Sequence, residues 1–164
     1  MIEVFLSRPT WIPESFRAGL DALLIRLGES GIVARTLGVN EVAGPKPLDD
    51  VIRLVESCYG MVVLGVPQIE VTDGLIKGER IRDPVYLPSE WNHIEAALGH
   101  ARAMPLLIVS HVGISRGVFD PRTAIVLTEA DLTNPAWPFA WNVSEALSVW
   151  QNLVMTRAGV SIQM

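Results

Sequence analysis

The feature that most constrains the fold of this chain is an almost unbroken apolar run, "YGMVVLGVP", at residues 59–67. An apolar run without polar alternation is typical of a central parallel strand whose two faces are both covered. Parallel neighbours need long crossover connections, which are usually helices. Strand-like and helix-like segments should therefore alternate around this run.

The rest of the chain has that alternation. Strand patterns occur at residues 2–7, 31–37, 104–110 and 123–129, and helical patterns occur at 13–27, at 47–60, after a capping Ser89 and at 142–159. We therefore predict an α/β fold of the flavodoxin-like type, an open parallel sheet of about five strands with helices on both faces. The 164 residues are enough for one domain, which we expect to span 1–164.

One segment interrupts the alternation. Residues 67–87, "PQIEVTDGLIKGERIRDPVYL", are charged and rich in turn-forming residues. The pattern predicts a long excursion from the sheet, with a small hairpin around Asp73-Gly74 or Gly78-Glu79.

Composition excludes several classes of protein. The net charge is −5 and no cluster of Lys and Arg stands out, which argues against binding to nucleic acid or an anionic membrane. No segment approaches the length of a membrane span, and the first residues lack a signal-peptide pattern. The single cysteine, Cys58, cannot form an internal disulfide and is expected to pack in the core. We expect a cytoplasmic protein.

The predicted topology also locates a ligand site. In open α/β sheets, ligands bind in the crevice beyond the carboxyl ends of the strands. That rule places Ser7, Arg8, the 38–47 loop, Gly65 and the start of the Ser89 helix around one crevice.

Several familiar site motifs are absent. There is no glycine-rich dinucleotide fingerprint and no triphosphate-binding loop. His93, His100 and His111 lack the spacing of metal ligands, so we expect no metal site.

The Ser89 helix carries the most suggestive pair of side chains. Trp91 and Glu95 are four residues apart and share one helical face, whereas Glu90 and Asn92 are expected to point elsewhere. A carboxylate beside an indole in a crevice is partly desolvated, which raises its pKa. The spacing alone nevertheless favours a simpler alternative, a buried Trp91 and a solvated Glu95.

Four segments together resemble a known family. They are "VFLSRP", "GIVARTLGVNEVAG" with its Ala43-Gly44 pair, "LDDVIRLVESCYGMVVLGVP" and "SEWNHIEAALGHARAMPLLIV". In this order they resemble the TIR domain (the Toll and interleukin receptor superfamily) over most of residues 1–112. The most specific match is W-x-x-x-E, which the enzymatic members carry in this helix and which Trp91 and Glu95 reproduce.

The resemblance implies an activity. Enzymatic TIR domains cleave the nicotinamide–ribosyl bond of NAD, as glycohydrolases or cyclases, and Glu95 matches their catalytic glutamate. NAD would be the substrate, and no cofactor is implied. Such domains self-associate, and stand-alone bacterial examples often serve in anti-phage defence by making a signalling nucleotide.

Substrate-binding roles follow for the residues around the crevice. Trp91 would cover the ribose or nicotinamide and exclude water. Arg8 could contact the pyrophosphate, or form only a surface ion pair. Trp11 could form an aromatic wall, or only pack on a helix. Ser7 and Gly65 complete the expected binding set.

The chain also departs from the family pattern. Enzymatic relatives often carry an acid after the second strand, where this chain has Leu37-Gly38, and an aromatic residue where it has Arg8. Two alternatives therefore stay open. One is an enzyme like the nucleoside 2-deoxyribosyltransferases, which use a glutamate in a similar crevice, and the other is a non-catalytic TIR module for assembly or ligand sensing.

Overall fold

The computed structural model describes residues 1–122 and 126–160. Its centre is a parallel sheet in the order β2-β1-β3-β8-β9, which confirms the predicted flavodoxin-like fold class. The strands are β1 (Ile2–Ser7), β2 (Ile32–Arg35), β3 (Met61–Gly65), β8 (Leu106–His111) and β9 (Leu127–Ala130). All five residues of β3 are buried, as its unbroken apolar sequence predicts.

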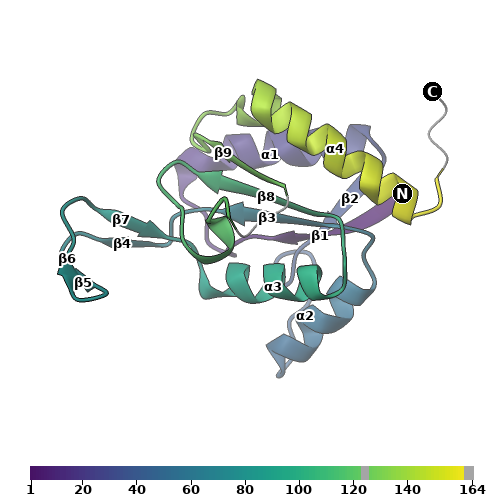
Figure 1. Ribbon diagram of the computed structural model, residues 1–164. Helices are drawn as coiled ribbons and strands as arrows, with labels where there is room; N and C mark the ends of the chain where they lie inside the picture. The colour runs from purple at the N-terminus through teal and green to yellow at the C-terminus, as the bar shows by residue number, and fades with distance from the viewer. Residues whose placement is uncertain (123–125, 161–164) are drawn as a thin grey trace.

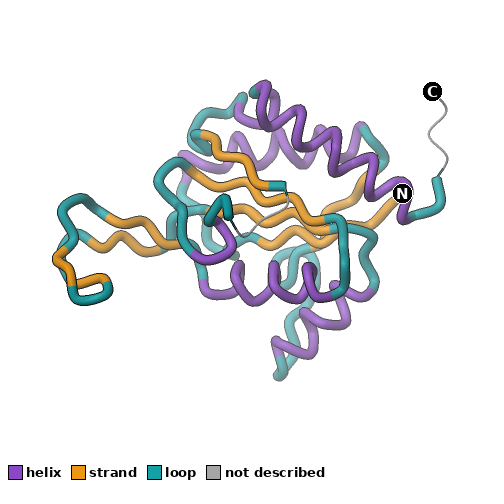
Figure 2. The backbone as a smooth tube through the Cα atoms, in the orientation of Figure 1, coloured by secondary structure: helices purple, strands orange, loops and turns teal. Residues whose placement is uncertain are grey.

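Helices cover both faces of this sheet (Figures 1 and 2). α1 (Glu14–Glu29) and α4 (Trp141–Arg157) lie on one face, and α2 (Pro47–Glu56) and α3 (Glu90–Ala101) lie on the other. Each pair encloses its own apolar core. No helix in residues 1–122 or 126–160 is long and apolar enough to cross a membrane.

The side of α4 that faces the sheet is apolar. Val143, Leu147, Trp150 and Val154 are fully buried, and the Trp150 indole donates a hydrogen bond to the carbonyl of Pro105 at 3.0 Å. On α1, Phe16, Leu20, Leu23 and Leu27 are buried, whereas Leu24 is 36% exposed.

The alternation of strands and helices fails between β8 and β9. In the described part of this connection there is one short 3-10 turn, η1 (Gly117–Phe119), and no α-helix. Phe119 of this turn is buried against the α2–α3 core, so a single aromatic anchor takes the place of a helical face. Of the predicted fifth strand, Leu127–Glu129 belong to β9, whereas 123–125 lie outside the described residues.

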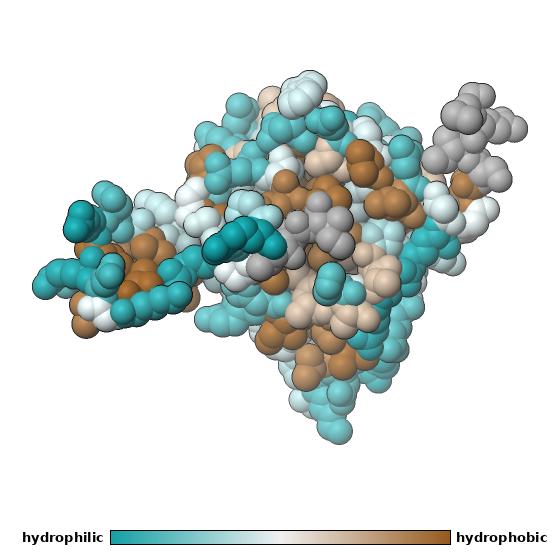
Figure 3. Space-filling model, viewed as in Figure 1, coloured by the Kyte–Doolittle hydropathy of each residue, from teal (hydrophilic) through white to brown (hydrophobic). Residues whose placement is uncertain are grey.

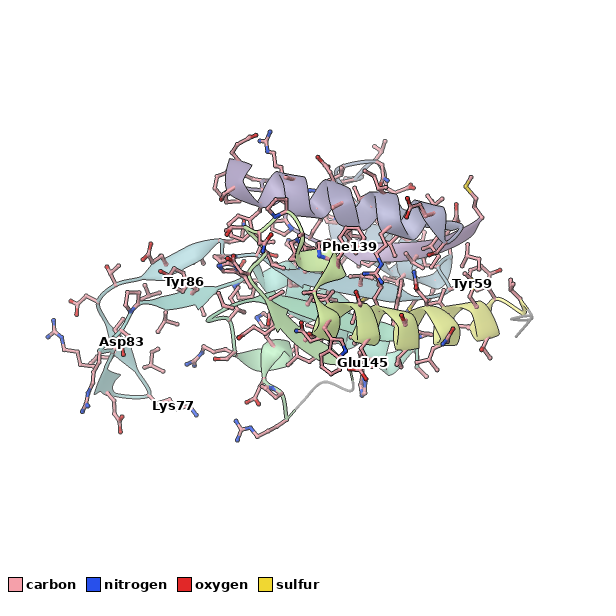
Figure 4. All side chains as sticks on the ribbon, turned by 90° about the horizontal axis from the view of Figure 1, so that it is seen from above. Tyr59, Lys77, Asp83, Tyr86, Phe139 and Glu145 are labelled. Carbon is pink, nitrogen blue, oxygen red and sulfur yellow. The ribbon has the colours of Figure 1, made fainter. Side chains whose placement is uncertain are left out.

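Residues 67–87 form a separate feature, which we call the arm. It leaves the carboxyl end of β3 and projects away from the sheet (Figure 1). Its stalk pairs β4 (Ile69–Val71) with β7 (Val85–Leu87), and its tip pairs β5 (Leu75–Ile76) with β6 (Glu79–Arg80). Figure 4 shows Lys77 and Asp83 toward the tip and Tyr86 on the stalk.

The tip turn has a clear local cause. Lys77 and Gly78 both have positive φ angles, 53° and 83°, which is the geometry of the tight hairpin turn that follows the strand twist. The excursion therefore contains a hairpin whose turn is Lys77-Gly78, one residue before the predicted Gly78-Glu79.

Candidate functional site

A cavity of about 360 Å³ opens at the carboxyl edge of the sheet, where the topology predicts a ligand site. Its volume is at the lower end of the range for small-molecule sites. Four parts of the chain form its wall: the segment after β1, the loop after β2 with the start of α2, the base of the arm and the start of α3. The lining residues are Arg8, Pro9, Thr10, Trp11, Leu37, Gly38, Ala43, Pro47, Val51, Gln68, Ser89, Trp91 and Glu95.

The sequence of α3 brings its first turns deep into this wall. Ser89 caps the helix, as predicted, by accepting a hydrogen bond from the Asn92 backbone N–H. The buried stripe consists of Asn92, Glu95, Ala96 and Gly99. A Cβ atom at Gly99 would lie 2.9 Å from the Met61 side chain, so the missing side chain allows α3 to approach β3 closely.

Glu95 is the carboxylate of this cavity. It is only 7% exposed, and burial raises its pKa to about 7, while a hydrogen bond with Ser7 acts in the opposite direction. A glutamate with that pKa changes its charge near neutral pH. It can therefore act either as an anion or as an acid under physiological conditions.

Ser7 and Asn92 are two buried polar residues that are hydrogen-bonded to each other. Ser7 ends β1 and is 1% exposed, and its Oγ accepts a hydrogen bond of 2.9 Å from Asn92 Nδ2. Asn92 is fully buried, and its Oδ1 accepts from Ser89 Oγ at 3.1 Å. The expectation that Asn92 points away from Glu95 is wrong, because both residues belong to the face of α3 that is buried against the sheet.

The two indoles lie at the mouth. Trp91 is 40% exposed and Trp11 63% exposed, and both line the cavity. Glu95 is thus the buried residue and Trp91 the exposed one, whereas spacing alone favours a buried Trp91 and a solvated Glu95. Trp91 is placed on the rim because the face next to it, with Ala96 and Gly99, is the one that packs on the sheet.

Arg8 is the cation of the cavity. It is half-buried, and burial lowers the pKa of its guanidinium, while Asp21 acts in the opposite direction. It donates a hydrogen bond to the carbonyl of Pro9 at 3.2 Å. Arginine keeps its charge at physiological pH, so Arg8 can meet an anionic group at the opening.

Gly65 is placed differently from the other predicted binding residues. It ends β3, and a Cβ atom there would lie 2.6 Å from the Phe119 ring. Gly65 is not among the residues that line the cavity. The close packing of Phe119 explains the glycine without any ligand.

Leu37 and Gly38 line the cavity without supplying an acid. The nearby Glu41 does not supply one either, because its carboxylate is bound to Arg35 Nε at 2.7 Å outside the cavity. Among the lining residues, Arg8 and Glu95 carry the charges.

Two of the histidines have structural partners. His93 Nδ1 accepts from the Val118 N–H at 3.5 Å, and His111 Nδ1 accepts from the Leu132 N–H at 3.1 Å. Burial lowers the pKa of both rings. In residues 1–122 and 126–160, no three His, Cys, Asp or Glu side chains are grouped to hold a metal ion.

Comparisons with known proteins identify little. No family model matches the chain, and neither does any curated protein. A solved structure of the TIR domains in the activated Roq1 resistosome directly recognizing the pathogen effector XopQ is similar over 98% of this chain and 86% of that chain. The identity is 12% and the TM-score is 0.45.

Proposed function

We propose that this protein cleaves the bond between nicotinamide and ribose in NAD or a closely related nucleotide, with Glu95 as the catalytic carboxylate. The observation that carries the proposal is a buried glutamate with a pKa of about 7 in a cavity edged by two indoles and one arginine. The resemblance of Trp91 and Glu95 to the W-x-x-x-E of TIR enzymes supports the same assignment. The reaction needs no bound cofactor.

The chemistry needs one carboxylate. Breaking the bond sends its electron pair to the ring nitrogen, so that the cationic pyridinium leaves as neutral nicotinamide without an added proton. Positive charge develops on the anomeric carbon, and the Glu95 anion stabilises it as a nucleophile or as an electrostatic partner. Water or a hydroxyl or ring nitrogen of the substrate then forms the new bond and releases a proton, which gives hydrolysis or cyclisation.

The other lining residues have matching roles. Trp91 and Trp11 can cover the planar ring and exclude water from the developing charge. Arg8 can hold the pyrophosphate through paired hydrogen bonds. A cavity of about 360 Å³ suits the nicotinamide riboside half, with the adenosine half outside the opening.

Self-association belongs to the same proposal. We expect copies of the chain to assemble when active, as TIR domains do, and a signalling product would fit a role in anti-phage defence. Exposed apolar side chains are available for such contacts, including Phe139 at 58% and Trp141 at 78% exposure.

The test is the product profile from NAD at high protein concentration, followed by chromatography. The wild type should release nicotinamide, and Glu95→Gln should lose the activity by roughly 10²–10³-fold. Glu90→Gln is the matched control, since Glu90 is an exposed acid on the same helix, and it should retain the activity.

Three results would contradict the proposal. Equal turnover by the wild type and Glu95→Gln would remove the role of Glu95. Base exchange on deoxynucleosides with intact NAD would select a deoxyribosyltransferase. Binding of NAD without turnover, unaffected by Glu95→Gln, would select a sensing module.

A further inference from the structure

Hydrogen-bond donors run in one direction from the cap of α3 to Glu95. Ser89 Oγ donates to Asn92 Oδ1 at 3.1 Å, and Asn92 Nδ2 donates to Ser7 Oγ at 2.9 Å. The Ser7 hydroxyl is in turn the hydrogen-bonding group that lowers the pKa of Glu95, against the effect of burial. Three polar side chains thus end on the carboxylate that lines the cavity.

The chemistry of the groups sets the direction of this chain. The amide nitrogen of Asn92 can only donate, so Ser7 Oγ accepts from it. The single hydroxyl proton of Ser7 is then available to Glu95, which as an anion can only accept. Ser7 and Asn92 are 1% and 0% exposed, so water does not compete for these bonds.

Other charged groups lie on the cavity wall and on the elements next to Glu95. Arg8 lines the same cavity, Asp50 lies on α2, and Glu90 and His93 lie on α3 itself. The pKa of Glu95 nevertheless follows from its burial and from the bond to Ser7.

We propose that Asn92 is a positioning residue, which orients the Ser7 hydroxyl so that it donates to one Glu95 oxygen and leaves the other oxygen for the substrate. The proposal rests on the proposed function for its role in catalysis, but the orientation itself can be measured without substrate. In this arrangement Ser7 hydrogen-bonds the Glu95 carboxylate and does not bind the nucleotide.

The arrangement has a consequence for the charge of the site. A donor to a carboxylate favours the ionised form, and neighbouring bonds in a chain polarise one another. Removing the Ser7 hydroxyl should therefore keep Glu95 protonated to higher pH. Removing Asn92 or Ser89, which lie one and two hydrogen bonds further from Glu95, should also raise the pKa of Glu95, by less at each step.

The test is a pH titration of Glu95 by NMR with carbon-13-labelled glutamate side chains, assigned with Glu95→Gln. Ser7→Ala should raise the pKa of Glu95 by about one pH unit, which is the value of one charge-assisted hydrogen bond. Asn92→Leu should raise it less, and Ser89→Ala least. Ser110→Ala is the matched control, since Ser110 is a serine on β8 that is 2% exposed, and it should cause no change.

A second measurement separates positioning from structure. In NAD cleavage, the pH dependence of kcat should move upward in Ser7→Ala and Asn92→Leu in the same order as the titration, with KM nearly unchanged. Ser7→Cys keeps the shape with a weaker donor and should lie between the wild type and Ser7→Ala; it also serves if Ser7→Ala does not fold.

The proposal is overturned if Ser7→Ala, or Ser7→Cys in its place, leaves the Glu95 titration where Ser110→Ala leaves it. It is also overturned if Asn92→Leu titrates like the wild type. If no form of the protein cleaves NAD, the proposed function fails, while the titration still decides whether Asn92 and Ser7 act on Glu95.

Discussion

At the scale of single residues, Glu95 shares the buried stripe of α3 with Asn92, Ala96 and Gly99. A carboxylate in such a place is costly to ionise, because burial removes it from water and one hydroxyl only partly compensates. A folded protein that keeps such a group sacrifices stability, and costs of this kind are concentrated at functional sites.

Replacing Glu95 by Gln should make stability less dependent on pH. The pKa of Glu95 is about 7 in the folded chain against an ordinary value of 4.5, so the folded state binds the proton more tightly. The contribution of Glu95 to stability is then greatest below about pH 4.5, declines as pH rises, and is fully lost once pH exceeds the folded pKa. Glu95→Gln removes this loss, and should be more stable than the wild type by about 1–3 kcal/mol at about pH 8 and similar to it at about pH 4.

Urea denaturation at the two pH values measures this difference. Glu90→Gln, which changes an exposed acid five residues earlier, should show no such gain at the higher pH. A Glu95→Gln variant that is less stable at both values would mean that the carboxylate stabilises the fold.

The sequence predicts part of this site and misses the rest for a physical reason. Arg8, Trp11, Trp91 and Glu95 can be placed in the crevice, because strand ends in a parallel sheet share one edge. Asn92 is missed because the spacing centres the predicted face of the helix on Trp91 and Glu95, which leaves Asn92 outside it. Its spacing of three, four and seven residues from the other members of the buried stripe is the signal that could have identified it.

At the scale of elements, the arm contacts the body near its base, where Tyr86 of the stalk packs against the α2–α3 core. The strands of the arm pair only with one another in the described structure, and the Gln68 N–H bonds the Leu87 carbonyl at 2.9 Å across its base. A short turn joining Gln68 to Tyr86 in place of residues 69–85 keeps this contact and should therefore leave the five-stranded sheet folded. Thermal unfolding should give a Tm within a few degrees of the wild type, and a large loss would mean that the arm supports the sheet.

The contact between α1 and η2 (Trp137–Phe139) depends on a glycine. A Cβ atom at Gly19 would lie 2.3 Å from Trp137 Nε1 and 3.3 Å from the Asn134 carbonyl oxygen. Gly19→Ala should therefore destabilise the fold by about 1–3 kcal/mol, because a buried indole must move.

Gly28 is the matched control, since it lies on the same helix with no atom near its absent side chain. Gly28→Ala should raise stability by about 0.5–1 kcal/mol through better helix propensity. Chemical denaturation of the two variants measures both signs, and a neutral Gly19→Ala would show that Trp137 has room to shift.

Element types follow from the sequence more readily than connections do. The apolar period identifies β3 and α4, whose burial is fixed by their own residues. The connection from β8 to β9 is anchored by Phe119, which packs into the α2–α3 core against residues far away in the sequence. Local periodicity does not reveal such a contact. The arm differs again, since its turn residues mark its hairpin without any help from packing.

At the scale of the whole molecule, apolar side chains are exposed on both the arm and the body. Figure 3 shows apolar side chains both on the arm, which carries Ile69 and Leu75 at 43% and 71% exposure, and on the body. Exposed apolar side chains favour association, whereas the net charge of −5 makes copies of the chain repel one another at neutral pH.

Salt should therefore promote the proposed self-association. The screening length falls from about 30 Å at 0.01 M to about 3 Å at 1 M ionic strength, which removes repulsion between whole chains but leaves apolar contacts intact. We expect sedimentation velocity to show larger assemblies as salt increases. NAD cleavage per chain should rise with it at low protein concentration, if assembly completes the site. Assemblies that dissociate as salt increases would instead place ion pairs, such as those available to the charged arm tip, at the centre of the interface.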